Sequence, residues 1–303
     1  MKISSKLSED DQEIQEIRIA RSKSDVRSWY DFIRSEFPGS SIGFVPTMGA
    51  LHKGHETLIE TASSRCDRVV VSIFVNPTQF GPGEDLDKYP RTFEADLEIC
   101  KRHGVDLVFS PEPTELYQSG TEALTFVEPP RELVERLCGL SRPGHFRGVA
   151  TVVAKLFNIV RPDQAFFGEK DFQQLQVVKR MVRDLDIPVE IVPVPTVRDY
   201  DGLALSSRNA YLSKAQREIA PRLQAGLVRI GELVRGQERL ALSEAIDLVR
   251  ADLSENDGFN IDYLEVCDCD TLEPLAEAPV DRKIVILIAA KLGAVRLIDN
   301  LVV

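Results

Sequence analysis

The sequence predicts an α/β protein in which a parallel sheet with helices on both faces precedes a smaller α+β domain. Apolar runs of strand length alternate with helical patterns through the first two thirds of the chain, which is typical of βαβ units. After Pro195 two long helical patterns come first and three strand-like runs follow, which is typical of an α+β unit. We therefore expect a lead-in at 1–20, a first domain at 21–196 and a second domain at 197–303.

In the first domain, each expected element follows from its apolar spacing and from the residues at its ends. Ser24 and Asp25 offer an N-cap to a helix that ends at Pro38-Gly39. The continuous apolar run 68–75 predicts a strand that is buried on both faces. The segment 76–92 is rich in Pro, Gly and Asp and predicts a long loop. The other expected strands are 41–45, 105–109, 165–167 and 189–192, and the other expected helices are 54–65, 92–102, 131–138, 149–160 and 172–185.

The second domain is expected to hold helices at 214–236 and 241–254 and strands at 260–267, 283–290 and 294–299. Gly293, between the last two strands, predicts a tight antiparallel hairpin. The run 284–290 is the most apolar of the chain, but a membrane helix needs roughly 18 such residues. We expect a buried strand there, and a loose tail or a short lead-in strand at 1–20.

Charge and cysteine content exclude several classes of function. With 37 basic and 48 acidic residues the net charge is −11, which argues against a general affinity for nucleic acid or for anionic membrane. The N-terminus lacks the apolar core of a signal peptide, so a cytoplasmic protein is expected. Five cysteines without a Cys-x-x-Cys pattern predict reduced thiols and no metal site.

The loop after the first expected strand carries two of the four histidines, His52 and His55. Ligands of open parallel sheets bind beyond the carboxyl ends of the strands, and a helix N-terminus is an anion site. Gly49 and Gly54 allow a ligand to approach the backbone closely. Alternatively, the two histidines could cap a helix, face solvent or ligate zinc. Zinc is disfavoured because no thiol or carboxylate lies at typical ligand spacing.

The pattern His52-Lys53-Gly54-His55 resembles the signature of the nucleotidyltransferase superfamily. Together, PTMGALHKGH, VSIFVNPTQF, RPGHFRGVATVV, FFGEKDFQQ and LSSRN resemble the pantothenate synthetase (pantoate–β-alanine ligase) family over about residues 20–303. The resemblance implies a Rossmann-like first domain that condenses (R)-pantoate with β-alanine through a pantoyl-adenylate, releasing AMP and diphosphate. It also implies ATP as co-substrate, Mg²⁺ and a homodimer.

The same resemblance implies the site residues. His55 is expected as the general acid, and His52 as a hydrogen-bond donor to phosphate. The remaining expected catalytic residues are Lys170, Ser206, Ser207 and Arg208. Gln79 and Gln174 are expected to hold the substrates pantoate and β-alanine, because an amide offers both donors and acceptors. The expected ATP contacts are Pro46, Thr47, Met48, Gly49, Ala50, Leu51, His52, Lys53, Gly54, His55, Gly168, Glu169, Lys170, Asp171, Val197, Leu205, Ser206, Ser207 and Arg208, with Leu205 standing where the family commonly has Met.

Several roles stay open at this point. Asp171 could bond the ribose or cap a helix, and Asn76 and Tyr89 could line or gate the site. Arg142, His145 and Arg147 form either a solvated basic loop or contacts to phosphate or to the carboxylate of β-alanine. No cluster of carboxylates in the sequence suggests a metal site built by the protein, so Mg²⁺ is expected to bind mainly to ATP.

Two other functions remain possible from the sequence. One is nucleotide transfer to phosphopantetheine or a similar acceptor, and the other is a regulatory module that only binds nucleotide. The second domain is expected to be a lid over the nucleotide, with 197–208 as hinge.

Overall fold

The computed structural model describes residues 17–121, 123–236, 240–256, 258–279 and 281–303. Most of the expected tail at 1–20 lies outside these residues, and its last part, Arg18–Ala20, forms the short strand β1. None of the described helices is long and apolar enough to cross a membrane.

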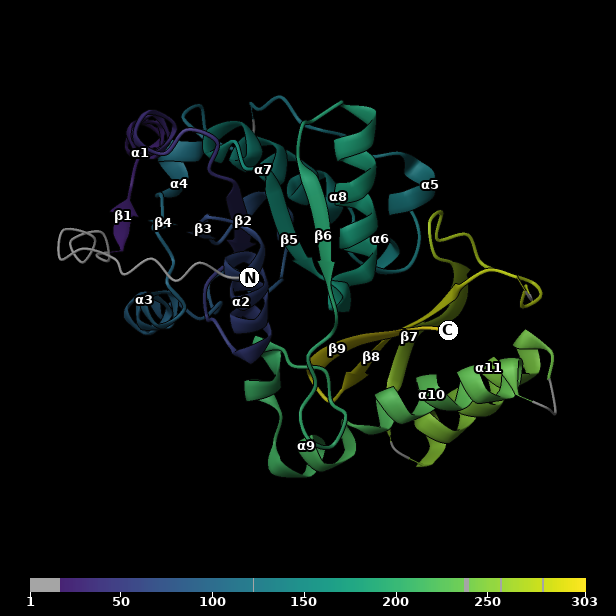
Figure 1. The fold of residues 1–303 in the computed structure, drawn as a ribbon. Coiled ribbons are helices and arrows are strands. Elements are labelled where there is room, and N and C mark those ends of the chain that lie inside the picture. Colours follow the sequence, from purple (N-terminus) through teal and green to yellow (C-terminus); the bar gives the residue numbers. More distant parts are fainter. Residues whose placement is uncertain (1–16, 122, 237–239, 257, 280) are drawn as a thin grey trace, which may run out of the picture.

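The first sheet has six parallel strands in the order β1-β4-β3-β2-β5-β6 (Figure 1). The chain builds outward from β2 through β3 and β4, and then from β5 to β6 in the opposite direction. The order therefore reverses between β2 and β5, and a crevice opens at their carboxyl ends. The bounds after β1 are β2 Ile42–Thr47, β3 Arg68–Ile73, β4 Leu107–Phe109, β5 Gln164–Gly168 and β6 Glu190–Val194.

Helices cover both faces of this sheet, as the continuous apolar strands require. Alternate strand residues enter different cores: Phe44 packs with α1, α7 and α8, whereas Val45 packs with α2 and α3. The helices of this part are α1 Lys23–Glu36, α2 Lys53–Arg65, α3 Phe93–Arg102, α4 Pro113–Leu116, α5 Arg131–Val134, α6 Cys138–Ser141, α7 His145–Val160 and α8 Phe172–Asp184. Two 3₁₀ turns, Pro77–Gln79 and Glu169–Asp171, follow β3 and β5.

The second sheet is antiparallel, in the order β7-β8-β9. Leu292 pairs with Val295 around Gly293, whose φ of +63° confirms the predicted hairpin. The elements of this part of the chain are the 3₁₀ turn Ser207–Tyr211, α9 Lys214–Ile219, α10 Arg222–Arg235, α11 Leu242–Ala251, the π-helical turn Asp252–Asn256, β7 Asn260–Asp268, β8 Ile284–Leu292 and β9 Val295–Val302.

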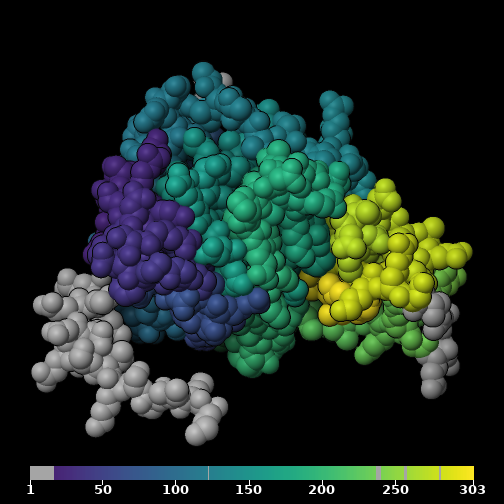
Figure 2. All heavy atoms as spheres, turned by 45° about the horizontal axis from the view of Figure 1, so that its top comes forward, coloured from purple at the N-terminus to yellow at the C-terminus, as the bar shows by residue number. Residues whose placement is uncertain are grey.

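The second sheet is buried on both of its faces. Ile286 and Ile288 pack with α10 and α11, whereas Val285 and Leu287 join the core of the first sheet. In the space-filling view the yellow C-terminal segment forms a lobe that abuts the teal and green part of the molecule (Figure 2). The two sheets are therefore held together by a shared core as well as by the chain.

Several expected boundaries were wrong, and four helices show why. The N-cap of α1 is Ser22, because its hydroxyl and the Asp25 carboxylate bond each other's backbone N–H in a capping box. The helix expected at 214–236 breaks before α10, where Pro221 has no N–H to continue it. The helix expected at 131–138 is two short helices, separated at Leu137 with φ +51°. The helix expected at 149–160 begins at His145, so part of the expected basic loop is helical.

Candidate active site

A cavity of about 240 Å³ opens at the switch point between β2 and β5. The loops that follow these two strands line it, together with the segment 194–208, which runs from the end of β6 into the second domain. The expected site residues that line it are Pro46, Thr47, Met48, His52, Gly54, His55, Gln79, Gly168, Lys170, Asp171, Gln174, Val197, Leu205, Ser206, Ser207 and Arg208. A second cavity of about 690 Å³ adjoins it under β9 and shares Lys170, Gln174 and Arg208.

The two histidines of the first loop cap helix α2 together. The backbone N–H of Gly54 donates to His52 Nδ1 at 3.1 Å, and the backbone N–H of His52 donates to His55 Nδ1 at 3.3 Å. An Nδ1 that accepts carries no proton, so the proton of each neutral ring lies on Nε2. The rings lie 4.2 Å apart between centroids, and each leaves an Nε2–H donor on the edge opposite the helix backbone.

Both imidazoles are held neutral in this structure. Burial, reinforced by the neighbouring His52 ring, lowers the pKa of His55 to about 3. Burial and the Lys170 ammonium lower the pKa of His52. At neutral pH the pair therefore presents two N–H donors without a fixed charge.

Five expected ATP contacts do not line the cavity, and the structure gives them other places or contacts. Gly49 and Ala50 adopt positive φ, and the buried Asp96 carboxylate accepts the N–H groups of Ala50 and Leu51 at 3.0 and 2.8 Å. Asp96 thereby fixes the backbone of the loop that precedes His52 without contacting the cavity. Lys53 points away to Glu60 on α2 at 3.2 Å. The fifth, Glu169, offers its backbone carbonyl to the second domain.

Lys170 and Asp171 follow β5 and line the cavity. The Lys170 ammonium lies 3.7 Å from the Asp171 carboxylate and is largely shielded from solvent. Asp171 occupies the N-cap position of α8, but its side chain makes no capping hydrogen bond. The capping alternative is therefore wrong for this residue, and its half-exposed carboxylate faces the cavity.

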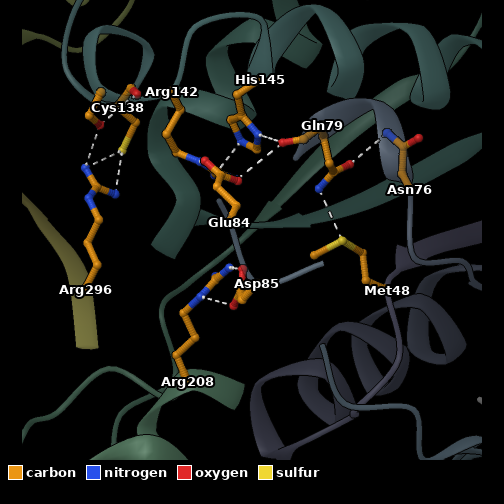
Figure 3. A network of polar contacts seen from close by, with 11 residues as sticks. Met48, Asn76, Gln79, Glu84, Asp85, Cys138, Arg142, His145, Arg208 and Arg296 are labelled. Carbon is orange, nitrogen blue, oxygen red and sulfur yellow. Dashed lines mark hydrogen bonds and ion pairs between the residues drawn. The ribbon is translucent and has the colours of Figure 1, made fainter. Parts of the chain in front are cut away.

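Gln79 is held in place by a buried polar cluster (Figure 3). Asn76 Nδ2 donates to Gln79 Oε1 at 3.0 Å, and Gln79 Nε2 lies 3.2 Å from the Met48 sulfur. The oxygen of Asn76 in turn accepts from Tyr117 at 2.7 Å and from Thr78. Because a thioether is a weak acceptor, the amide N–H groups of Gln79 remain available to a ligand.

The basic motif 142–147 is divided by the structure. Arg142 is paired with Glu84 at 2.6 Å and donates to His145 Nε2 at 3.0 Å, while His145 Nδ1 donates to the carbonyl of Gln79 at 2.8 Å (Figure 3). Burial and the Arg142 charge lower the pKa of His145 to about 4, which leaves it neutral. Arg147 points elsewhere and stacks on Phe126 at 4.5 Å.

The segment Ser206–Arg208 reaches the cavity from the second domain. Arg208 forms two hydrogen bonds with Asp85, at 3.1 and 3.2 Å (Figure 3). Burial opposes its charge, but the Asp85 carboxylate raises the pKa of Arg208. The hydroxyls of Ser206 and Ser207 line the same cavity, beside the buried Tyr89 ring.

Three acidic residues that organise the site, Glu84, Asp85 and Asp96, were not predicted from the sequence. Glu84 and Asp85 lie in the Pro/Gly-rich loop, where acidic residues are usually read as solvated, and only the fold shows that each faces an arginine. Among the described residues one group, Glu56, Glu60 and His103, could hold a metal ion, and it does not line the cavity.

Comparisons with known proteins find similar chains over nearly the whole length of this one. The family model described as pantoate–β-alanine ligase matches residues 18–302. The pantothenate synthetase of Shewanella sp. strain ANA-3 is 50% identical over 279 residues, 92% of this chain and 95% of that relative. A crystal structure of pantothenate synthetase from Thermus thermophilus has a TM-score of 0.85 and 45% identity, covering 94% of this chain and 99% of that chain. A pantoate–β-alanine ligase from Francisella tularensis, complexed with Beta-gamma ATP and β-alanine, has a TM-score of 0.74 and 37% identity, covering 94% and 97%.

Proposed function

The chain belongs to the pantoate–β-alanine ligase family, and we propose that its cleft condenses (R)-pantoate with β-alanine while ATP becomes AMP and diphosphate. A pantoate carboxylate oxygen attacks the α-phosphorus of ATP, and the bond to diphosphate breaks. The β-alanine amine then attacks the acyl carbon of pantoyl-adenylate and loses a proton as AMP leaves. Adenylation is needed because hydroxide is a poor leaving group. The family match over nearly the whole chain argues against transfer to phosphopantetheine and against a regulatory module.

The observation that carries the proposal is the paired Nδ1 capping of His52 and His55. It directs two neutral Nε2–H donors to the switch point, where the phosphates of a nucleotide would lie. The family resemblance implies that His55 is a general acid. Its low pKa supports a neutral donor instead, which stabilises charge as it develops on the phosphate.

Cationic and hydroxyl groups on the other walls would complete the phosphate site. We assign Lys170 as a point charge on the phosphates, and the hydroxyls of Ser206 and Ser207 as donors. Arg208 is already paired with Asp85, so it would reach the phosphates by sharing or leaving that carboxylate. The Val197 and Leu205 backbone, joined by an N–H···O bond of 2.9 Å, supports the adenine side of the cavity.

Pantoate is assigned to Gln79 and Gln174. Amides bind its hydroxyls and carboxylate without a full positive charge, so the carboxylate keeps its nucleophilicity for attack on ATP. The wall behind them is apolar, with Val149, Val152 and Leu156 from α7. This wall would exclude water that hydrolyses the mixed anhydride.

Magnesium would neutralise phosphate charge during the displacement. Of the described residues that line the cavity, Asp171 alone is a carboxylate, so we assign the ion mainly to ATP, with Asp171 within reach of it or of the ribose. The sequence favours a cytoplasmic protein, and the family resemblance implies a homodimer. We assign the segment 197–303 as the cover over the nucleotide. Light scattering of the purified protein tests the dimer.

The test of the function is the substrate dependence of AMP release. The proposal predicts AMP only when ATP, pantoate and β-alanine are all present. His55→Ala should lower kcat by roughly 100- to 1,000-fold, as loss of one transition-state donor does, while calorimetry still detects ATP binding. His103→Ala, a histidine outside the cavity, is the control and should keep full turnover. AMP release without pantoate, or unchanged turnover of His55→Ala, would contradict the proposal.

A further inference from the structure

Asn300, in the last strand of the chain, holds the loop that carries Lys170. Its side-chain nitrogen donates to the backbone carbonyls of Glu169 and Lys170 at 2.8 and 2.9 Å. Carbonyl oxygens only accept, so the reversed amide would place its oxygen against two oxygens, and the orientation is fixed. Asn300 is 6% exposed, and its loss would leave these carbonyls without their donor.

The preceding residue, Asp299, holds the other segment that faces the cavity. Its buried carboxylate forms a bidentate pair with Arg198, at 2.7 and 2.9 Å. Arg198 also donates to the carbonyls of Gly202 and Asn300. Arg198 thus closes the base of the loop that leads into Ser206–Arg208.

Strand β9 carries both contacts. Asp299 and Asn300 lie within its pairing with β8, opposite Ile288 and Leu287, which are buried on the two faces of the sheet. β9 runs beside the carboxyl end of the first sheet, where the Lys170 loop begins (Figure 1). Two consecutive residues of one strand therefore hold both the Lys170 loop and the loop that leads into Ser206–Arg208.

We propose that Asn300 is a positioning residue for ATP, which acts by fixing the Lys170 loop against the segment Ser206–Arg208. The second domain is then a structural part of the adenylation site as well as its cover. The inference rests on the proposed function, because it takes Lys170 to contact the phosphates. The closeness of Lys170 to the histidine pair agrees with this, since its charge lowers the pKa of both His52 and His55.

A double-mutant cycle between Asn300 and Lys170 tests the proposal. Asn300→Ala removes the donors, and Asn300→Asp keeps the shape but sets a carboxylate against two carbonyls. Each variant is measured alone and combined with Lys170→Ala, for kcat/KM of ATP, KM of pantoate, and the ATP dissociation constant by calorimetry. Asn158→Asp is the control, because its amide also donates to a backbone carbonyl, at 2.8 Å, but on the exposed side of α7.

Asn300→Ala should lower kcat/KM for ATP by roughly 10- to 100-fold, the cost of a misplaced catalytic group, and leave KM for pantoate within about twofold. In the Lys170→Ala background the same substitution should change kcat/KM for ATP, and the ATP dissociation constant, by less than about threefold. Equal losses in both backgrounds, or a parallel rise of both KM values, would overturn the proposal. A wild-type protein that released no diphosphate would refute the proposed function, and the calorimetric cycle would still decide the role of Asn300.

Discussion

His52 and His55 are bonded through their backbone and ring nitrogens into a single cap on helix α2. The His52 N–H donates to His55 Nδ1 at 3.3 Å, and His52 Nδ1 accepts from Gly54. Each bond uses the ring nitrogen that faces the protein and leaves the other to a ligand. The motif therefore fixes a tautomer as well as a position, which a pair of histidines at other spacing would not do.

Gly54 is needed because a side chain there would meet the His52 ring. A Cβ at this position would lie 2.9 Å from His52 Cε1, so Gly54→Ala must displace the imidazole. We expect kcat/KM for ATP to fall by roughly 10- to 100-fold, with little loss of thermal stability. Gly81→Ala meets nothing closer than 3.8 Å and should stay within about twofold of wild type. Equal activity of both variants would show that the ring position is not critical.

Asp96 is expected to hold the first loop in its catalytic shape. Asp96→Ala removes the acceptor of the Ala50 and Leu51 N–H groups, at a cost of about 1–3 kcal/mol in the free energy of unfolding. Because the loop leads into His52, KM for ATP should also rise. Urea unfolding and steady-state kinetics measure the two effects. Glu94→Ala, on the exposed side of the same helix, should change neither, and an Asp96→Ala protein with unaltered KM would contradict the assignment.

Gln79 is expected to bind pantoate and not the nucleotide. Gln79→Ala should raise KM for pantoate about tenfold or more, the cost of a lost amide contact to a charged group, with a much smaller change in KM for ATP. Gln173→Ala is the control, because Gln173 is buried and, among the described residues, its amide bonds backbone groups, including Cys138 N at 3.0 Å and Leu133 O at 2.9 Å. It should lower stability without changing KM for pantoate. Equal losses of pantoate and ATP affinity in Gln79→Ala would remove the assignment.

The neutral histidines predict how stability depends on pH. The folded pKa values of His55 and His145, about 3 and about 4, lie below the ordinary 6.5. Between these folded values and pH 6.5, the unfolded chain therefore binds more protons than the folded chain. Stability should therefore fall as the pH drops below 6.5, by about 1.4 kcal/mol per pH unit for each ring. His55→Asn and His145→Gln should each flatten the dependence of Tm on pH between 6.5 and 5. Slopes identical to wild type would show that the rings are protonated in the folded protein.

The parallel architecture of the first sheet follows from local patterns that the sequence displays, whereas its strand order comes from the structure. Each buried strand is a continuous apolar run, and the helices between them have clear apolar spacing, so the parallel architecture was predictable. Boundaries failed where one residue decides them. Pro221 interrupts an apolar pattern that otherwise continues. Ser22, and not Ser24, is the N-cap of α1 because it forms the reciprocal hydrogen bonds with Asp25.

The site was predictable only where its residues lie within motifs. His52, His55 and Lys170 follow strands at the switch point, and the structure brings them to one cavity. Asn300 and Asp96 act through backbone groups of distant segments, and such pairings depend on the tertiary fold. Lys53 shows the converse: it lies inside the motif, but its place on α2 turns it toward Glu60.

A single-turnover reaction without amine tests the proposed activation of pantoate most directly. Enzyme in excess over ATP is mixed with pantoate, and diphosphate and AMP are followed with time. We expect that diphosphate forms at once, that pantoyl-adenylate stays bound, and that AMP appears only when β-alanine is added. If no diphosphate formed until β-alanine was present, activation of pantoate at the His52–His55 site would be contradicted.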